Sequence, residues 1–147
     1  MIIVAGPPCS GKTTYVKERA LPEDAILDWD TIYTEIAGPG PRPAPVGWDR
    51  VRQATELEFR RRWDAMTTGW VIRCAPHKQH RSIMRKQRGA RSIVLAVPVA
   101  ECIRRLMLDD TRPDKDAWVN EIWRWWMEYE PSNSRDEMVI CPPSHAS

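Results

Sequence analysis

Short apolar runs recur along this chain, and longer polar or amphipathic stretches separate them. The runs are nearly continuous rather than alternating, which is typical of strands in a parallel sheet with both faces covered. They predict strands at Ile2–Ala5, Ala25–Asp28, Trp70–Cys74, Ser92–Val97 and Met138–Cys141.

The stretches between these runs have the character of helices. They predict helices over roughly Lys12–Ala20, Thr31–Ala37, Asp49–Met66, His77–Arg88, Val99–Leu108 and Lys115–Tyr129. Strands that alternate with helices indicate a doubly wound α/β fold with right-handed crossovers. The 147 residues suit a single domain, residues 1–147, with one core.

The last predicted helix is rich in tryptophan. Trp118, Ile122, Trp125, Trp126 and Tyr129 recur at helical spacing, which favours packing of this face against the sheet. A platform on which nucleobases stack is the weaker alternative.

Composition narrows the class of protein without identifying it. The formal charge of +2 does not by itself indicate binding to nucleic acid or acidic membranes. No apolar run approaches the ~20 residues of a membrane span. No basic leader precedes the first apolar run, so a signal peptide is not expected. The four cysteines form no C-x-x-C pair, which favours reduced thiols that act as small apolar residues, in a cytoplasmic protein.

The first strand stops at "GPPCSGKT", which matches the phosphate-binding pattern G-x-x-x-x-G-K-[ST]. Glycines let the backbone wrap so that its N–H groups face phosphate oxygens, and the following helix adds its positive end. Lys12 is expected on the β- and γ-phosphates and Thr13 on Mg²⁺. The predicted nucleoside triphosphate site comprises Gly6, Pro8, Cys9, Ser10, Gly11, Lys12, Thr13 and Thr14.

Two absences favour a kinase among the proteins with such a loop. Motor ATPases usually end a strand in acidic residues, but the third predicted strand reads "WVIRCAP", with Arg73 in that position. The guanine-recognition motif Asn-Lys-x-Asp does not occur either.

The second predicted strand ends in "LDWD", which places Asp28 and Asp30 where ligands sit in an open α/β sheet. Period-2 alternation would point both carboxylates the same way. One could accept a hydroxyl proton while the other supports Mg²⁺ through water. The alternative is that one carboxylate only caps the next helix, and Asp30 is well placed for that cap.

At this point the sequence resembles a known family. "GPPCSGKTT", "LDWD" and a late arginine-bearing helix are similar to the small P-loop kinases grouped with polynucleotide 5′-kinases and zeta toxins, many of them encoded by bacteriophages. The resemblance implies a three-layer P-loop fold, ATP (or another triphosphate) and Mg²⁺. It also implies a general base after the second strand, best matched by Asp30 and then Asp28.

The same family carries arginines in a late lid that clamps the transferring phosphoryl group. Here "CIRRLMLDDTRPDKD" offers Arg104, Arg105 and Arg112, and the lid is expected near residues 108–116. Arg112 is the first choice and Arg105 the second, because a rigid guanidinium fork suits phosphoryl oxygens. Arg73 departs from the family pattern. It could bind an anionic acceptor or pair with Asp28.

The acceptor is less constrained by the sequence. Residues 31–69 could form an acceptor-side insertion, which includes the Pro- and Gly-rich segment 38–47. That segment is either a stiff linker or a substrate-side loop in which Arg42 faces a ligand.

A basic helix offers a second clue to the acceptor. In the stretch 77–91, Lys78, Arg81, Arg85 and Arg88 share one helix face, which is either an ordinary solvated face or a nucleic-acid footprint.

Three hypotheses about function therefore stand at this stage. The chain could transfer a phosphoryl group from ATP to a hydroxyl of a nucleotide, nucleoside or other small molecule. It could act on DNA or RNA, or it could be a non-catalytic nucleotide-binding module. A phage-encoded kinase would work in the host cytoplasm, and the sequence does not fix the oligomeric state.

Overall fold

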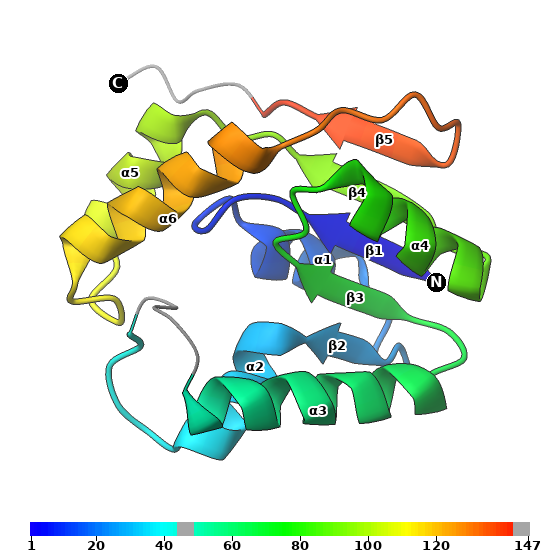
Figure 1. Cartoon of the computed structure of the whole chain (residues 1–147), viewed down its shortest axis with the longest axis horizontal. Coiled ribbons are helices and arrows are strands. Elements are labelled where there is room, and N and C mark those ends of the chain that lie inside the picture. Colours follow the sequence, from blue (N-terminus) through cyan, green and yellow to red (C-terminus); the bar gives the residue numbers. More distant parts are fainter. Residues whose placement is uncertain (44–48, 143–147) are drawn as a thin grey trace.

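The fold is built around a parallel sheet. In the computed structural model, which describes residues 1–43 and 49–142, five strands lie in the order β2-β3-β1-β4-β5 (Figure 1). All the paired neighbours are parallel. The strands are β1 (Ile2–Ala5), β2 (Ile26–Asp28), β3 (Trp70–Arg73), β4 (Arg91–Leu95) and β5 (Glu137–Ile140). The predicted α/β fold with a parallel sheet is thus confirmed.

Helices connect the strands much as predicted. They are α1 (Lys12–Arg19), α2 (Trp29–Ala37), α3 (Arg50–Ala65), α4 (Lys78–Arg88), α5 (Val99–Met107) and α6 (Lys115–Glu128). The largest difference from the sequence prediction is the start of α2, which begins at Trp29 instead of Thr31. The alternative that one carboxylate caps this helix is confirmed, but the capping residue is Asp28 and not Asp30. Asp28 caps α2 by accepting a hydrogen bond from the Asp30 N–H, and Asp30 lies inside the first turn.

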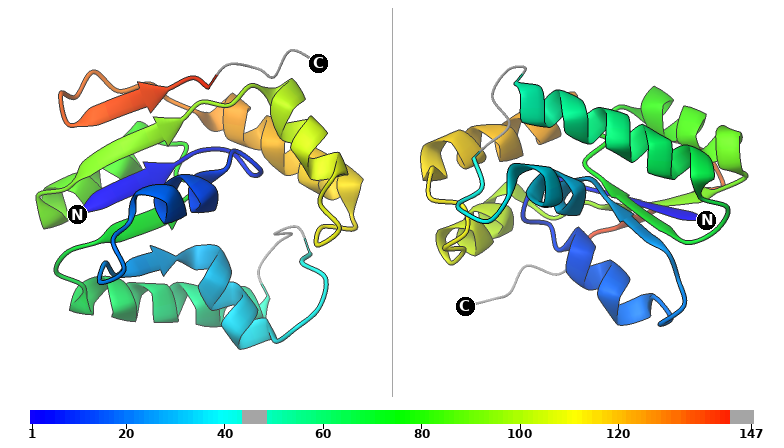
Figure 2. Two further views of the ribbon diagram at one scale, coloured as in Figure 1. Left: turned by 180° about the vertical axis from the view of Figure 1, so that it is seen from behind. Right: turned by 90° about the horizontal axis from the view of Figure 1, so that it is seen from below.

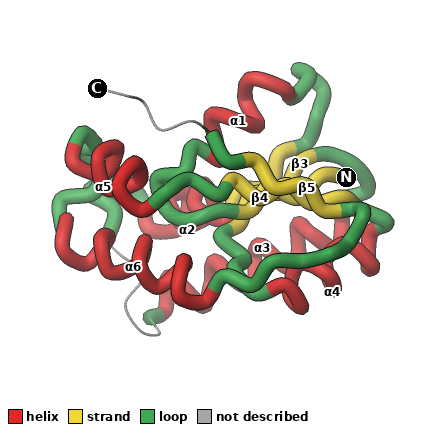
Figure 3. Tube along the Cα trace, turned by 90° about the horizontal axis from the view of Figure 1, so that it is seen from above, coloured by secondary structure: helices red, strands yellow, loops and turns green. Residues whose placement is uncertain are grey.

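The alternation of side chains along the strands produces the three layers. Val4 and Ile72 face one side and pack in a cluster with Val16 of α1. Ile3 and Val71 face the other side, in a cluster to which α3 and α4 contribute. Figures 2 and 3 show α1 on the face of the sheet opposite α3 and α4. Near-continuous apolar strands are therefore explained by burial on both faces.

Helix α6 packs against α5 and buries much of its aromatic face. Trp118 and Trp125 are almost fully buried, and the ring of Tyr129 stacks 4.8 Å from that of Trp125. The predicted core role of this face is confirmed, whereas Trp123 lies on the exposed side.

The basic face predicted on α4 does not exist as a surface. Arg81 is fully buried, and Arg85 is 7% exposed. Both guanidinium groups form ion pairs of 2.8 Å with the buried side chain of Glu137 in β5. Both interpretations made from the sequence, a solvated face and a nucleic-acid footprint, are therefore wrong for these two arginines. The partner lies more than fifty residues away, so local spacing gave no indication of it.

The cysteines divide into two kinds. Cys102 is buried, as a small apolar residue would be, whereas Cys74 and Cys141 are exposed just after the ends of β3 and β5. The expectation that these two lie within strands was wrong by one position. In the described part of the chain, no helix combines the length and apolar character needed to cross a membrane.

Candidate active site

The phosphate-loop segment follows β1 and turns sharply because of Gly6. A Cβ at Gly6 would lie 2.7 Å from the Ser10 Oγ and 2.9 Å from the Leu95 carbonyl oxygen, so no other residue fits without a shift. The Gly6 N–H donates to the Cys74 carbonyl at the carboxyl edge of the sheet. The turn is thereby fixed to the sheet at the edge where α/β proteins bind ligands.

The rest of the loop has the features of an anion site. Cys9 and Gly11 adopt positive φ angles of 63° and 84°. Gly11 is the N-cap of α1, and among the described residues no side chain caps this helix. The first-turn N–H groups are therefore left for a ligand, with the positive helix end behind them. Ser10 Oγ is buried with no hydrogen-bond partner in the part of the chain that the structure describes. The loop thus fits a polyphosphate.

Lys12 lies at the base of this loop. Its Nζ donates to the carbonyl oxygens of Gly6 (3.0 Å) and Pro7 (2.8 Å), and its side chain is nearly buried. These contacts hold the ammonium group against the loop backbone. An ammonium group in this position supplies a point charge to a bound phosphate.

Asp28 faces the start of α1 from the end of β2. Its Oδ2 accepts a hydrogen bond of 3.2 Å from Thr13 Oγ1, and its Oδ1 accepts the Asp30 N–H at 3.0 Å. Burial raises the pKa of the Asp28 carboxyl, and the nearby charge of Asp30 raises it further. A cation beside this carboxylate would offset both effects.

The oxygens of Thr13 and Asp28 fit a hard cation such as Mg²⁺. Within residues 1–43 and 49–142, no group of three or more His, Cys, Asp or Glu side chains could hold a metal without a ligand's help. Mg²⁺ usually binds through one or two protein oxygens, substrate phosphates and water, so this donor set is sufficient.

Two of the predicted arginines reach the loop from α5 and the segment after it. Arg105 Nε pairs with Glu101 at 3.0 Å, and its Nη1 donates to the Cys9 carbonyl at 3.4 Å. Arg112 pairs with Asp109, and its guanidinium lies 4.7 Å from the centre of the Trp118 ring. Both positive charges therefore lie beside the loop. Arg104, by contrast, is half exposed and does not line the cavity.

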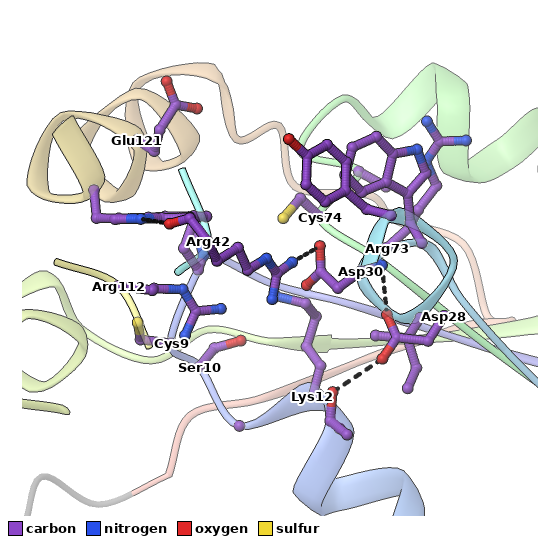
Figure 4. A pocket seen from close by; sticks show the side chains of 18 of the residues that line it. Cys9, Ser10, Lys12, Asp28, Asp30, Arg42, Arg73, Cys74, Arg112 and Glu121 are labelled. Carbon is purple, nitrogen blue, oxygen red and sulfur yellow. Dashed lines mark hydrogen bonds and ion pairs between the residues drawn. The ribbon is translucent and has the colours of Figure 1, made fainter. Parts of the chain in front are cut away.

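A cavity of about 640 Å³ brings the predicted site residues together. Figure 4 shows Lys12, Asp28, Asp30, Arg42 and Arg112 around it. Every predicted site residue except Gly6 and the third candidate arginine, Arg104, contributes to its lining. The full set comprises Pro8, Cys9, Ser10, Gly11, Lys12, Thr13, Thr14, Asp28, Asp30, Arg42, Arg73, Arg105 and Arg112.

Helices α2 and α3 form the far side of the cavity from the loop. The ring of Trp29 stacks 5.5 Å from that of Tyr33, and Trp29 Nε1 donates to Glu56 at 2.8 Å. Arg73 pairs with the same Glu56 at 2.7 Å and lies over the Phe59 ring. Arg73 does not pair with Asp28, so that alternative is wrong. Its charge instead serves to fix Glu56 at the cavity wall.

Arg42 connects the two sides of the cavity. Its guanidinium forms an ion pair with Asp30, as Figure 4 shows. Its backbone N–H donates to the Thr111 carbonyl at 2.9 Å, and Trp118 Nε1 donates to its carbonyl at 3.3 Å. Of the segment 38–47, the structure describes residues 38–43, and this part fits the substrate-side interpretation better than that of a linker. Residues 44–47 lie outside the described residues.

Sequence reasoning missed several residues that line this cavity. Trp118 was expected in the core, with a base-stacking platform as the weaker alternative, yet its ring and indole N–H contact Arg42 and Arg112. No sequence pattern indicated a role for Glu56, because its hydrogen-bond and ion-pair partners belong to α2 and β3, far from it along the chain. Four further lining residues are Asp49, Arg52, His80 and Glu121. Burial lowers the pKa of His80 and raises that of Glu121.

Comparisons of sequence find no similar family and no similar curated protein. Solved structures do match. A sugar kinase of Janibacter sp. HTCC2649 aligns with a TM-score of 0.54 and 16% identity, over 96% of this chain and 83% of that protein. A gluconokinase of Sinorhizobium meliloti 1021 aligns with a TM-score of 0.58 and 14% identity, over 95% and 81% respectively. A Thermus thermophilus protein gives 0.54 and 16%, over 98% and 88%.

These matches span nearly the whole chain and most of each neighbour. At such low identity they establish the fold, which is that of P-loop kinases. The finer resemblance to polynucleotide 5′-kinases, zeta toxins and phage proteins stays a prediction.

Proposed function

We propose that this protein is an ATP-dependent phosphotransferase that moves the γ-phosphoryl group to a hydroxyl of a small molecule. The observation that carries the proposal is the shared cavity, in which the phosphate loop with Lys12 faces the Asp30 carboxylate. Lys12, Arg105 and Arg112 supply positive charge on the donor side. The kinases among the structural neighbours support this assignment through the fold alone.

The chain's own groups account for each step of such a transfer. The loop N–H groups and Lys12 bind the triphosphate, while Thr13 and Asp28 would hold Mg²⁺, which would neutralise phosphate charge. Asp30 accepts the hydroxyl proton as the hydroxyl oxygen attacks. Arg105 and Arg112 stabilise the charge on the transferring phosphoryl oxygens. Residues 108–116 act as the lid and residues 31–69 as the acceptor-side part of the single domain, residues 1–147.

A small polyhydroxylated compound is the acceptor class that we favour. The cavity is lined by the carboxylates of Asp49, Glu56 and Glu121, and Glu56 accepts a hydrogen bond from Trp29 of the Trp29–Tyr33 ring pair. Carboxylates accept hydrogen bonds from hydroxyl groups, and aromatic rings pack on the apolar faces of sugars. A nucleic-acid strand would meet these negative charges, and Arg81 and Arg85 of α4, which could have bound it, are buried.

A nucleoside or nucleotide is the second candidate acceptor. The specific observation in its favour is the Trp29–Tyr33 stack, since a nucleobase can pack on partly buried aromatic rings that line a cavity. Both candidates use the same donor site and the same base, so they differ only in the acceptor.

A transfer screen with γ-labelled ATP and Mg²⁺ tests the proposal. The acceptors are sugars, sugar acids, nucleosides, mononucleotides and 5′-hydroxyl oligonucleotides. We expect labelled product with at least one small acceptor and none with the oligonucleotides. ATP binding without transfer to any acceptor would instead favour a non-catalytic module, and labelled oligonucleotides would restore the nucleic-acid hypothesis.

A further inference from the structure

The proposed base is not free in this structure, because Arg42 holds it. The Arg42 guanidinium pairs with the Asp30 carboxylate, and the two side chains are only 19% and 37% exposed. The backbone of Arg42 is fixed on both sides of its peptide unit, by the Thr111 carbonyl and by the Trp118 indole N–H. The contact is therefore a partly buried ion pair whose arginine backbone is fixed by hydrogen bonds, and it differs from a solvent-exposed surface ion pair.

This pairing conflicts with the role proposed for Asp30. The Oδ1 atom of Asp30 is occupied by the Arg42 guanidinium, so this oxygen cannot accept the hydroxyl proton while the ion pair persists. Asp30 must turn from Arg42 to the acceptor hydroxyl before it can take the proton. The reaction therefore requires an exchange of partners at Arg42.

The exchange leaves Arg42 in need of a new negative partner. The other carboxylates of the described residues that line the cavity are already engaged: Asp28 with Thr13 and the Asp30 N–H, Asp49 with the Arg52 N–H, Glu56 with Arg73, Asp109 with Arg112, and Glu121 with Arg124. A guanidinium that is largely withdrawn from water and loses its counter-charge is unfavourable. The missing negative charge has to arrive with a substrate.

We propose that the acceptor carries one anionic group, a carboxylate or a phosphate, which takes over Arg42 and thereby releases Asp30. This inference rests on the proposed function and names the class of its substrate. The donor is a less suitable source of the charge, because Lys12, Arg105 and Arg112 already face the phosphate loop. Arg42 instead reaches the base from the acceptor-side segment.

The exchange links proton transfer to the presence of an acceptor. With the acceptor bound, the hydroxyl oxygen forms a bond to the γ-phosphorus, and the bond from that phosphorus to the bridging oxygen breaks. ADP leaves with the bond's electron pair, and Asp30 takes the hydroxyl proton. Without an acceptor, Arg42 keeps Asp30 engaged and water is not activated. Arg42 thus suppresses wasteful hydrolysis of ATP.

Two assays on full-length Arg42→Gln test the proposal, with Arg61→Gln as the matched control because Arg61 is exposed and far from the cavity lining. In the first assay, ATP hydrolysis is measured without any acceptor. We expect Arg42→Gln to hydrolyse ATP about tenfold faster than the wild type. Arg61→Gln should match the wild type. The double variant Arg42→Gln/Asp30→Asn should lose the increase, because the released base causes it.

The second assay compares acceptors that differ in one anionic group: gluconate with glucitol, glucose 6-phosphate with glucose, and AMP with adenosine. For the pair that the wild type phosphorylates, kcat/KM should be about tenfold or more higher for the anionic member. Arg42→Gln should remove this preference mainly through KM.

The outcomes separate this inference from the proposed function. A neutral preferred acceptor, or an anionic preference that survives in Arg42→Gln, would overturn the role of Arg42 alone. So would hydrolysis and transfer that both fall in Arg42→Gln, since Arg42 would then be acting on the phosphoryl group. Absence of ATP turnover in the wild type with every acceptor, despite ATP binding, would overturn the proposed function and the inference with it.

Discussion

Two regions of this molecule gather arginines and carboxylates, and they use them differently. At the junction of α4 and β5, the donors of Arg81 meet Glu137 and the carbonyl oxygens of Ala75, Pro76 and Glu130. At the cavity, the Nε of Arg112 is buried with no partner among residues 1–43 and 49–142. The first set is satisfied within the protein, whereas the second retains donors for a ligand.

The comparison teaches that residue type and spacing do not distinguish a structural arginine from a functional one. On α4 the helical spacing of Arg81 and Arg85 looks like a binding face, yet both are buried and paired. Arg112 and Arg42 lie in irregular segments without any periodicity. What separates them is the partner: Arg81 and Arg85 pair with the buried Glu137, whereas Arg42 pairs with the proposed base Asp30 and Arg112 has a buried Nε without a partner in the described residues.

Among the substitutions that distinguish the two regions, Lys12→Ala is expected to have the largest effect. It removes the charge that the phosphate loop presents, so transfer should fall about 10³-fold or more, which corresponds to about 4 kcal/mol. The fold should survive, because the Lys12 ammonium contacts only two loop carbonyls. Steady-state kinetics and a urea titration check the two expectations. Loss of folding together with activity would contradict the separation of the regions.

The next largest effect should come from Glu137→Gln, and it should be on stability. The substitution leaves Arg81 and Arg85 buried without their counter-charge, so we expect a loss of about 3 kcal/mol in the free energy of unfolding. Urea unfolding measures it, with exposed Glu18→Gln as the control. ATP affinity of the folded variant should be unchanged. If Glu137→Gln instead kept its stability and bound ATP less tightly, Glu137 would belong to the binding site and not to the structural ion pairs.

Arg112→Gln should affect chemistry and spare stability. One guanidinium donor to the transferring phosphoryl group is worth about 10²-fold in kcat. Single-turnover transfer measures this loss against Arg61→Gln, which removes an exposed arginine outside the cavity. If Arg112→Gln keeps full kcat, the lid role passes to Arg105.

The smallest effect should be a pH dependence that belongs to the α4–β5 junction. Hydrogen bonds and charges from Arg81, Ser92 and Arg85 lower the pKa of Glu137 below its ordinary value of 4.5, although burial opposes them. Because the folded state binds this proton less readily than the unfolded chain does, its contribution is complete above the unfolded pKa. It disappears as the pH falls through the folded-state pKa. Urea unfolding between pH 6 and about 3 should show a steeper loss in the wild type than in Glu137→Gln. Equal slopes would contradict the assignment.

The parts of the site that could be predicted from the sequence are those whose residues lie close together along the chain. Gly6, Gly11, Lys12 and Thr13 lie within one turn between a strand and a helix, so pattern and geometry coincide. The strands and helices were predictable for a similar reason, since each is set by its own apolar pattern.

Other features depend on contacts that only the folded chain creates. Asp30 is helical because Asp28 caps α2, a choice that the "LDWD" pattern left open. The pairs Arg42–Asp30 and Arg81–Glu137 join segments that the topology brings together from distant places. Arg73 likewise meets Glu56 of α3 rather than Asp28, across 17 residues of sequence.

The most direct test of the account is the rate of phosphoryl transfer by Asp30→Asn, measured in a single turnover with γ-labelled ATP and the best acceptor of the screen. The asparagine keeps the shape of the side chain but cannot accept the hydroxyl proton. We predict that transfer falls by about 10³-fold while ATP affinity is unchanged. Transfer at the wild-type rate would contradict the central claim that Asp30 is the base opposite the phosphate loop.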